Sequence, residues 1–456
     1  MKQINLFTFF LVGMPGIQLL VVNGEETSKN TTTFPIQNSE AIEIKRTFAE
    51  RIAKAQEIFS DGDFLNSYID PDKVKTYYRG VYETVVVDVG GTHLKISKVF
   101  IDSSLPKREG ALSFDGAMEC IPSFYRYPDT SNLQNEDKIT WNDWVAERMV
   151  EFYGQDLPKK KINASLTFSY PLFQTSISNA KMERATKNFC FRIDDHTFDE
   201  DVVEALNTSL RNRNVNVHVS CVINDSTATY MAGALRGYDN IIGIVLGTGT
   251  NSSFCVKKNG TDSVTLYNSE WGSTSVPRSM LTEADLAVIT DLETKKISYS
   301  IIDVLVGGCK LNDMILNSLK TLHPELYEKY IDCEEELSLA ISLAIKRQNE
   351  GILKEDVDLS QTLASIINDF NARGMKILAS LVSAVIESCM KDMQYVTLIL
   401  NGTTFSYEDL RRALKENVKE IHPNIDIRLE FLGNASLEGA AFVSLMSSDN
   451  SNPERL

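Results

Sequence analysis

Two glycine-containing turns, each preceded by a hydrophobic strand, constrain the fold of this chain more than any other feature. Residues 84–89 form an apolar, β-branched run that leads into Gly90-Gly91-Thr92, and residues 241–246 lead into Gly247-Thr248-Gly249 in the same way. Glycine lets the backbone approach a ligand closely, and successive N–H groups can bind a phosphate. An ordinary β-turn also suits two glycines, but the repetition predicts a duplicated lobe that holds a polyphosphate.

Neither turn carries a standard nucleotide-binding motif. No Gly-Lys-Ser/Thr sequence follows the glycines, which excludes a P-loop, and Ser252 stands where a third glycine would complete GxGxxG. The polyphosphate prediction therefore depends on the duplicated pattern alone at this point.

A polar pair, Asn224-Asp225, follows a predicted buried strand over residues 215–223 and precedes a predicted helix. In open α/β sheets, ligands bind at the carboxyl ends of the strands. A carboxylate at this place can accept a proton from a bound hydroxyl. The alternative is that Asn224 or Asp225 is simply the N-cap of the helix, because both residue types suit that position.

Composition narrows the class of protein. A chain of 456 residues is too long for one core, so two or three lobes are expected. The formal net charge of -16 argues against nucleic acid as a partner, because phosphate backbones need a basic surface. The seven cysteines form no CxxC pair and no zinc-type cluster, so no protein metal site is expected and reduced thiols in a cytoplasmic protein are the simplest interpretation.

The N-terminus leaves a second localisation open. Lys2 and the apolar run of residues 6–22 resemble a signal peptide, while a flexible tail is the alternative. Gly13, Pro15 and Gly16 interrupt the run, so no stable membrane span is expected.

Elsewhere, periodicity and turn residues predict alternating strands and helices. Ser39 is expected to cap a helix that extends to about Phe59. Helices are also predicted over residues 141–153, 201–211, 407–421, 437–446 and most of 300–393, and strands over 94–100, 165–170, 252–257, 396–400 and 425–432. The turns after the last two strands could hold a nucleotide base and ribose, or serve as plain connections.

Several motifs in a fixed order resemble the eukaryotic hexokinase family. The resemblance covers about Ser39 to Ser447 and is carried by Asp88-Val89-Gly90-Gly91-Thr92, Thr167-Phe168-Ser169-Tyr170-Pro171 with Gln174-Thr175, Thr186-Lys187-Asn188-Phe189, Asn224-Asp225, Gly247-Thr248-Gly249-Thr250-Asn251 and Glu270. It implies an α/β, two-lobed actin-like ATPase fold with a deep interlobe cleft. Residues 1–38 would form a tail, residues 83–223 a small lobe with helix 437–447 packed on it, and residues 39–82 and 224–436 a large lobe.

The resemblance also implies roles for individual residues. Asp225 would be the catalytic base and Lys187 a catalytic cation. The implied sugar ligands are Ser169, Thr186, Lys187, Asn224, Asp225, Asn251, Glu270 and Asp303. The implied nucleotide contacts are Asp88, Gly90, Gly91, Thr92, Lys95, Gly247, Thr248, Gly249, Gly402, Thr403 and Ser436. ATP would be the phosphoryl donor, and Mg²⁺ would bridge its phosphates.

The chain departs from the family pattern at informative positions. Lys95 replaces an arginine, Asn401 replaces an aspartate, and Asp303 replaces a glutamate that binds the anomeric end of the sugar. The Asp225-Ser226 pair and Tyr230 resemble divergent fungal N-acetylglucosamine kinases. Three functions remain open: an ATP-dependent kinase of glucose-like hexoses, an N-acetylglucosamine kinase, and a catalytically weak sugar sensor, each as a monomer or homodimer.

Overall fold

The computed structural model describes residues 36–57, 60–70, 81–102, 118–130, 132–186, 189–194, 196–348 and 350–448. The signal-like segment of residues 6–22 and the predicted catalytic cation Lys187 lie outside the described residues.

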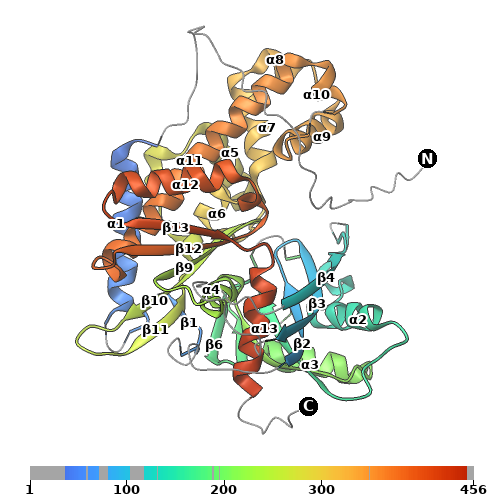
Figure 1. The fold of residues 1–456 in the computed structure, drawn as a ribbon. Coiled ribbons are helices and arrows are strands. Elements are labelled where there is room, and N and C mark those ends of the chain that lie inside the picture. Colours follow the sequence, from blue (N-terminus) through green and yellow to red (C-terminus); the bar gives the residue numbers. More distant parts are fainter. Residues whose placement is uncertain are drawn as a thin grey trace. The chain divides into compact units, whose positions relative to one another are not determined.

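A five-stranded sheet occupies the first part of the chain (Figure 1). Its order is β4-β3-β2-β5-β8, with the first three strands antiparallel and the last three parallel. The strands are β4 (Met118–Arg126), β3 (His93–Asp102), β2 (Val81–Val89), β5 (Ile162–Phe168) and β8 (Val217–Ile223). Helices α2 (Trp141–Tyr153) and α3 (Val202–Asn212) contribute to the core of this sheet, and a hairpin of β6 (Leu172–Ser176) and β7 (Asn179–Met182) follows β5.

A six-stranded sheet follows later in the chain. Its order is β1-β11-β10-β9-β12-β13, antiparallel from β1 to β9 and parallel from β9 to β13. The strands are β1 (Leu65–Asn66), β11 (Val264–Asn268), β10 (Thr250–Lys257), β9 (Ile241–Leu246), β12 (Tyr395–Asn401) and β13 (Asp426–Phe431). Helices α1 (Asn38–Ala55), α11 (Val357–Cys389) and α12 (Glu408–Ile421) share its hydrophobic core.

The two sheets repeat one connectivity, as the paired glycine turns predict. In each, three antiparallel strands in sequence order are followed by two parallel strands that arrive after helical crossovers. The first glycine turn joins β2 to β3, and the second joins β9 to β10. Because parallel strands end at one edge of a sheet, the connectivity brings polar turn residues from distant parts of the chain together.

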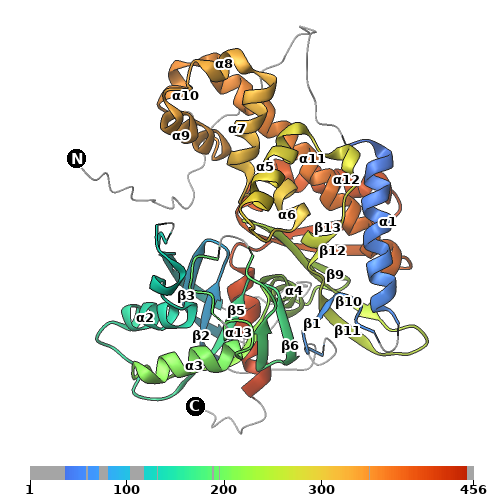
Figure 2. The same ribbon diagram turned by 180° about the vertical axis from the view of Figure 1, so that it is seen from behind.

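Two helices join the sheets. Helix α4 (Asp225–Leu235) packs on β9 and β10, while α13 (Ala435–Ser448) packs on β2 and β5, and the helices pack against each other (Figures 1 and 2). A Cβ atom on Gly439 would lie 1.8 Å from the Ala228 carbonyl oxygen, so only glycine permits this approach. The site residues at the start of α4 are therefore anchored to both sheets.

The remaining helices form a separate hydrophobic cluster with the first half of α11. They are α5 (Glu283–Thr294), α6 (Ile301–Val306), α7 (Leu311–Leu322), α8 (Pro324–Glu328), α9 (Glu334–Ile345) and α10 (Ile352–Glu355). Short 3-10 helices complete the described elements: η2 (Asn135–Asp137), η3 (Trp271–Ser273), η4 (Arg278–Met280) and η5 (Thr403–Ser406). Within the described ranges, no helix combines the length and the apolar character that a membrane crossing requires.

One predicted helix start is wrong. The first helix begins at Asn38, and the Glu40 carboxylate accepts the Gln37 N–H at 3.0 Å, so Ser39 is not the cap. The helix ends at Ala55 rather than near Phe59, which lies outside the described residues.

Candidate active site at the first turn of helix α4

Asn224 and Asp225 lie where β8 ends and α4 begins. The Asn224 Oδ1 atom accepts the Ser226 N–H at 2.9 Å, so Asn224 is the N-cap and the cap prediction is confirmed for this residue. Asp225 occupies the first helical position with 9% of its surface exposed. Since the asparagine provides the capping oxygen, the fold does not need the Asp225 carboxylate as a cap. The helix N-terminus stabilises a negative charge at this place.

Three further side chains join Asn224 in one hydrogen-bonded group. The Nδ2 atom of Asn251, on β10, lies 2.8 Å from Glu270 Oε1 and 3.2 Å from Asn224 Oδ1. It also lies 2.8 Å from Asn268 Oδ1, and Asn268 Nδ2 donates to Glu270 Oε1 at 2.8 Å. The structure therefore brings together Asn224, Asn251 and Glu270, which were predicted as sugar ligands. Asn268 was not predicted, although it belongs to the same polar loop as Glu270.

Ser169 and Thr186 come from the end of β5 and the segment after β7. Ser169 is buried and its N–H donates to the Val89 carbonyl at 3.0 Å. The Asn224 amide reaches the neighbouring carbonyl of Phe168 at 3.4 Å, which links this strand end to the first turn of α4. Thr186 is 6% exposed, and its Oγ1 atom has no hydrogen-bond partner within the described part of the chain. A buried hydroxyl without a partner is costly, so this atom is a candidate ligand contact.

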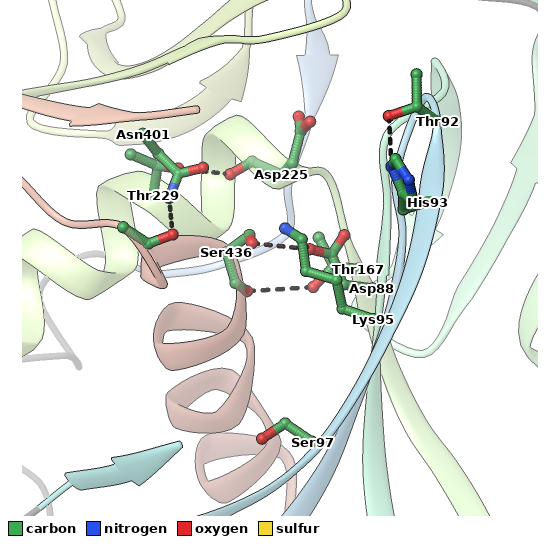
Figure 3. Close-up of polar contacts among 12 residues, drawn as sticks. Asp88, Thr92, His93, Lys95, Ser97, Thr167, Asp225, Thr229, Asn401 and Ser436 are labelled. Atoms are coloured by element: carbon green, nitrogen blue, oxygen red, sulfur yellow. Dashed lines mark hydrogen bonds and ion pairs between the residues drawn. The ribbon is translucent and has the colours of Figure 1, made fainter. Parts of the chain in front are cut away.

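The first glycine turn is supported by charge pairing at its base (Figure 3). Asp88, at 2% exposure, accepts Lys95 Nζ at 2.9 Å and Ser436 Oγ at 2.8 Å through Oδ2. Its Oδ1 atom is buried and has no partner among the described residues. Burial alone would lower the pKa of Lys95, but the carboxylates of Asp88 and Asp225 raise it above its usual value. Lys95 and Ser436, two predicted nucleotide contacts, are thus joined by Asp88.

The two glycine turns touch each other. A Cβ atom on Gly91 would lie 3.0 Å from Thr248 Cβ, so the first turn lies against the second. On the first turn itself, a Cβ atom on Gly90 would lie 2.9 Å from the His93 carbonyl oxygen. Tyr127, a residue not predicted from the sequence, donates its hydroxyl to the Gly90 carbonyl at 2.7 Å. Thr92 follows these glycines, and its Oγ1 atom lies 3.0 Å from His93 Nδ1 (Figure 3).

The residues that follow α6 bond to the backbone of the second glycine turn. The N–H groups of Gly308 and Cys309 donate to the carbonyls of Gly247 and Thr248 at 2.8 and 3.0 Å. The Gly247 N–H donates to the Gly249 carbonyl at 2.9 Å within the turn. Three main-chain hydrogen bonds therefore support the backbone of this turn.

Asp303, on α6, contacts this turn directly. Its Oδ1 atom accepts the Thr250 N–H at 2.7 Å and would lie 2.6 Å from a Cβ on Gly249. The carboxylate was predicted to bind the anomeric end of the sugar, and that role stays a prediction. The structure shows this carboxylate bonded to the backbone at the end of the glycine turn.

The late turns meet near the same edge of the six-stranded sheet. Gly402 has a φ of 106° and follows β12, and a Cβ there would lie 2.1 Å from the Leu246 carbonyl oxygen, just before the second glycine turn. Asn401 Nδ2 donates to the Leu432 carbonyl at 2.7 Å and so joins the turn after β12 to the turn after β13. Thr403 opens η5 beside Gly402.

No group of three or more His, Cys, Asp or Glu side chains within the described ranges has the geometry of a metal site. The arrangement nevertheless offers a carboxylate, a set of amides, a cation and two turns of backbone N–H groups. Such a set can bind a polyhydroxylated ligand and a polyphosphate side by side.

Comparison with known proteins agrees with this architecture. Two models of the hexokinase family match residues 27–235 and 241–446. Hexokinase-1 of Spinacia oleracea is 25% identical over 384 residues, which cover 74% of this chain and 72% of that protein. Hexokinase-1 of Oryza sativa subsp. japonica is 27% identical over 254 residues, half of this chain and 46% of its own length.

A solved structure has the same fold. The hexokinase from Schistosoma mansoni complexed with glucose superposes with a TM-score of 0.71 at 18% identity, and the match covers 91% of this chain and 96% of that one. The duplicated sheets, the helices between them and the family matches over nearly the whole described chain lead to one conclusion. This chain belongs to the hexokinase family and has its two-lobed, actin-like α/β fold.

Proposed function

We propose that this protein transfers the γ-phosphoryl group of ATP to the 6-hydroxyl of a hexose. The observation that carries the proposal is the position of Asp225. Asp225 is the first residue of α4 and follows Asn224, a member of the Asn224–Asn251–Glu270 group. Its carboxylate interacts electrostatically with Lys95, just after the first glycine turn. A base placed between a set of polar ring ligands and a phosphate-binding turn is what phosphoryl transfer to a sugar requires.

The polar group would hold the sugar. Amide and carboxylate side chains can accept from and donate to ring hydroxyls, and a sugar would compete for the hydrogen bonds that now join Asn251 to Glu270 and Asn224. Ser169 and Thr186 would complete the ring contacts. The Thr186 hydroxyl, which lacks a partner among the described residues, would gain one. Asp225 would then accept the proton of the 6-hydroxyl as its oxygen attacks.

The glycine turns would hold the phosphates. Glycine at position 91 leaves room for the backbone to lie against Thr248, and Asp88 keeps a buried oxygen without a partner in the described chain. These features fit a polyphosphate with its Mg²⁺. When bound, the polyphosphate would supply the phosphoryl group and the Mg²⁺ would neutralise its charge. Thr92, Thr248 and Lys95 would contact the phosphates, Gly402, Thr403 and Ser436 would lie nearer the nucleoside, and Lys187 would add a cation at the transferred group.

We also propose the division into lobes and the location. Residues 83–223 with helix 437–447 would form the small lobe, and residues 39–82 and 224–436 the large lobe, which together would exclude water from the transfer. The seven cysteines are widely spaced and form no CxxC pair, which supports a reducing, cytoplasmic location.

A second candidate substrate is N-acetylglucosamine. The position of the Asp303 carboxylate favours it. Its Oδ1 atom bonds to Thr250 N at 2.7 Å and packs against Gly249 and Gly272. A side chain one methylene shorter than glutamate, drawn to the turn in this way, would reach a sugar hydroxyl less well. The space left would admit a group larger than a hydroxyl on the sugar.

A coupled ADP-release assay with glucose, mannose, fructose, N-acetylglucosamine and N-acetylmannosamine tests these proposals. We expect sugar-dependent ADP release that requires Mg²⁺, with activity on at least one plain hexose. Release with the 2-acetamido sugars alone would establish the second candidate. Calorimetric binding of a sugar without any ADP release would overturn catalysis and identify the protein as a sugar sensor.

We predict that Lys95→Ala raises the KM for ATP by about ten- to a hundredfold, because a charged hydrogen bond to a phosphate is worth about 1.5–3 kcal/mol. Sugar affinity should change little. Lys98→Ala is the matched control, since Lys98 lies on the same strand but packs over the ring of Tyr153, 5.2 Å from its centroid. An unchanged KM for ATP in Lys95→Ala would limit Lys95 to its ion pair with Asp88.

A further inference from the structure

Arg51, a residue far from the sugar-binding motifs in sequence, is buried beside the loop that carries Glu270. It lies on α1, which packs against α11. Only 11% of its side chain is exposed. Arginine is rarely buried to this extent unless its guanidinium has specific partners.

The guanidinium donates to groups that precede and follow Glu270 in the chain. Its Nη2 atom donates to the Ser269 carbonyl at 2.9 Å, and Nη1 donates to Thr274 Oγ1 at 2.8 Å. Nη1 also reaches the Glu270 carbonyl at 3.5 Å. Planar, forked donors suit this task because they fix two acceptors in one geometry.

The orientation of the fork is itself fixed. Its Nε atom pairs with Asp63 Oδ2 at 2.7 Å. The rings of Phe48 and Phe64 lie 5.5 and 5.3 Å from the guanidinium carbon, a cation–π arrangement. Arg51 is therefore a rigid support rather than a mobile surface charge.

The supported residue has an unusual backbone. Glu270 has φ 44° and ψ 44°, the left-handed conformation, which is unfavourable for a residue with a side chain. Such a conformation persists only where surrounding contacts impose it. The conformation matters because it aims Glu270 Oε1 at the amides of Asn251 and Asn268.

We propose that Arg51 is a positioning residue for sugar binding: by holding Ser269, Glu270 and Thr274, it fixes the direction of the Glu270 carboxylate. The proposal deepens the proposed function, since it depends on Glu270 as a sugar ligand. Through Arg51, helix α1 would contribute to the affinity for the sugar.

The test measures sugar binding by calorimetry, so it does not depend on turnover. We expect Arg51→Met to weaken binding of the sugar that the wild type binds most tightly by about tenfold, with the KM for ATP nearly unchanged. Arg51→Lys keeps the charge but cannot bridge two acceptors, so it should lose affinity to a smaller extent. Arg46→Met is the matched control, because Arg46 lies on the same helix and its ion pairs among the described residues are with Glu43 and Glu50 of that helix.

A double-mutant cycle with Glu270→Gln separates positioning from general support. If Arg51 acts through Glu270, Arg51→Met should cost much less affinity in the Glu270→Gln background than in the wild type. Equal losses in both backgrounds, or a lower unfolding temperature with unchanged affinity, would overturn the proposal. If Glu270→Gln alone binds sugar normally, the assigned role of Glu270 fails, and the positioning role fails with it. Sugar binding without ADP release would instead remove only the proposed catalysis. If Arg51→Met does not fold, Arg51→Lys and its cycle give the same decision.

Discussion

An Asp225→Asn variant is expected to bind sugar normally and to turn over at least about a hundredfold more slowly than the wild type. The amide keeps the shape of the carboxylate but cannot take the proton of the attacking hydroxyl. The fold should tolerate the change, because the α4 cap is Asn224 Oδ1, 2.9 Å from the Ser226 N–H. ADP release at saturating ATP and sugar measures turnover, and calorimetry measures sugar affinity.

Asp201→Asn is the matched control for this variant. Asp201 is the N-cap of α3, and its Oδ1 atom accepts the Glu204 N–H at 2.8 Å, a bond that an asparagine oxygen can keep. The Ala180 N–H, 2.7 Å from Oδ2, would lose its acceptor, so the effect of this control is expected on stability rather than on turnover. Asp201→Asn should leave turnover unchanged. Near-full activity in Asp225→Asn would show that Asp225 is not the base. A large drop in its unfolding temperature would assign the carboxylate a role in stability instead.

An Arg373→Met variant is expected to lose about 3–5 kcal/mol of stability, because it leaves a buried carboxylate without its cation. Arg373 on α11 pairs with Asp285 on α5 through two bonds of 2.6 and 2.8 Å, and the two side chains are 1% and 0% exposed. Asp285 also accepts the Thr282 N–H at 2.8 Å and so completes the capping box of α5, whose N-cap residue is Thr282. Denaturant and thermal unfolding measure the loss.

Two further variants test whether the loss comes from the buried ion pair. Lys295→Met, which removes an exposed pair with Asp291 at the end of the same helix α5, should have little effect. Replacing both partners, as Asp285→Leu with Arg373→Met, should recover part of the stability, because an apolar pair needs no charge compensation. Recovery should be incomplete because the Thr282 N–H and hydroxyl lose their acceptor with Asp285, although the Thr282 hydroxyl can still accept the backbone N–H of residue 285. A small loss in Arg373→Met alone would mean that water or a neighbour compensates the carboxylate.

Elements with strong local signals were predicted closely. The strand expected over residues 241–246 is β9 (Ile241–Leu246), and the helix expected over residues 141–153 is α2 (Trp141–Tyr153). Both carry a continuous apolar run or a helical apolar stripe, and α2 has a local cap in Thr140. Their boundaries depend on neighbouring residues, which the sequence displays directly.

Strands that depend on a partner were missed. β4 contains Pro122 and lies at the edge of its sheet, where β3 is its one partner among the described strands. β1 has two residues and exists through its pairing with β11. A strand of this kind is stabilised by the ladder that it joins, so its own residues carry little signal.

The sequence by itself determined the duplicated strand–turn–strand plan, the family, and the residue types at the strand ends, because those signals are local and occur in order along the chain. Only the tertiary structure decided how these residues support one another. Ser436 bonds to Asp88 across 348 positions of the sequence, and Arg51 bonds to the Glu270 loop across 218 to 223 positions. The Asp303 carboxylate accepts the N–H of Thr250, which lies 53 positions earlier in the chain. Such contacts depend on the packing of separate elements and on the direction of side chains, which no spacing within a single stretch of sequence encodes.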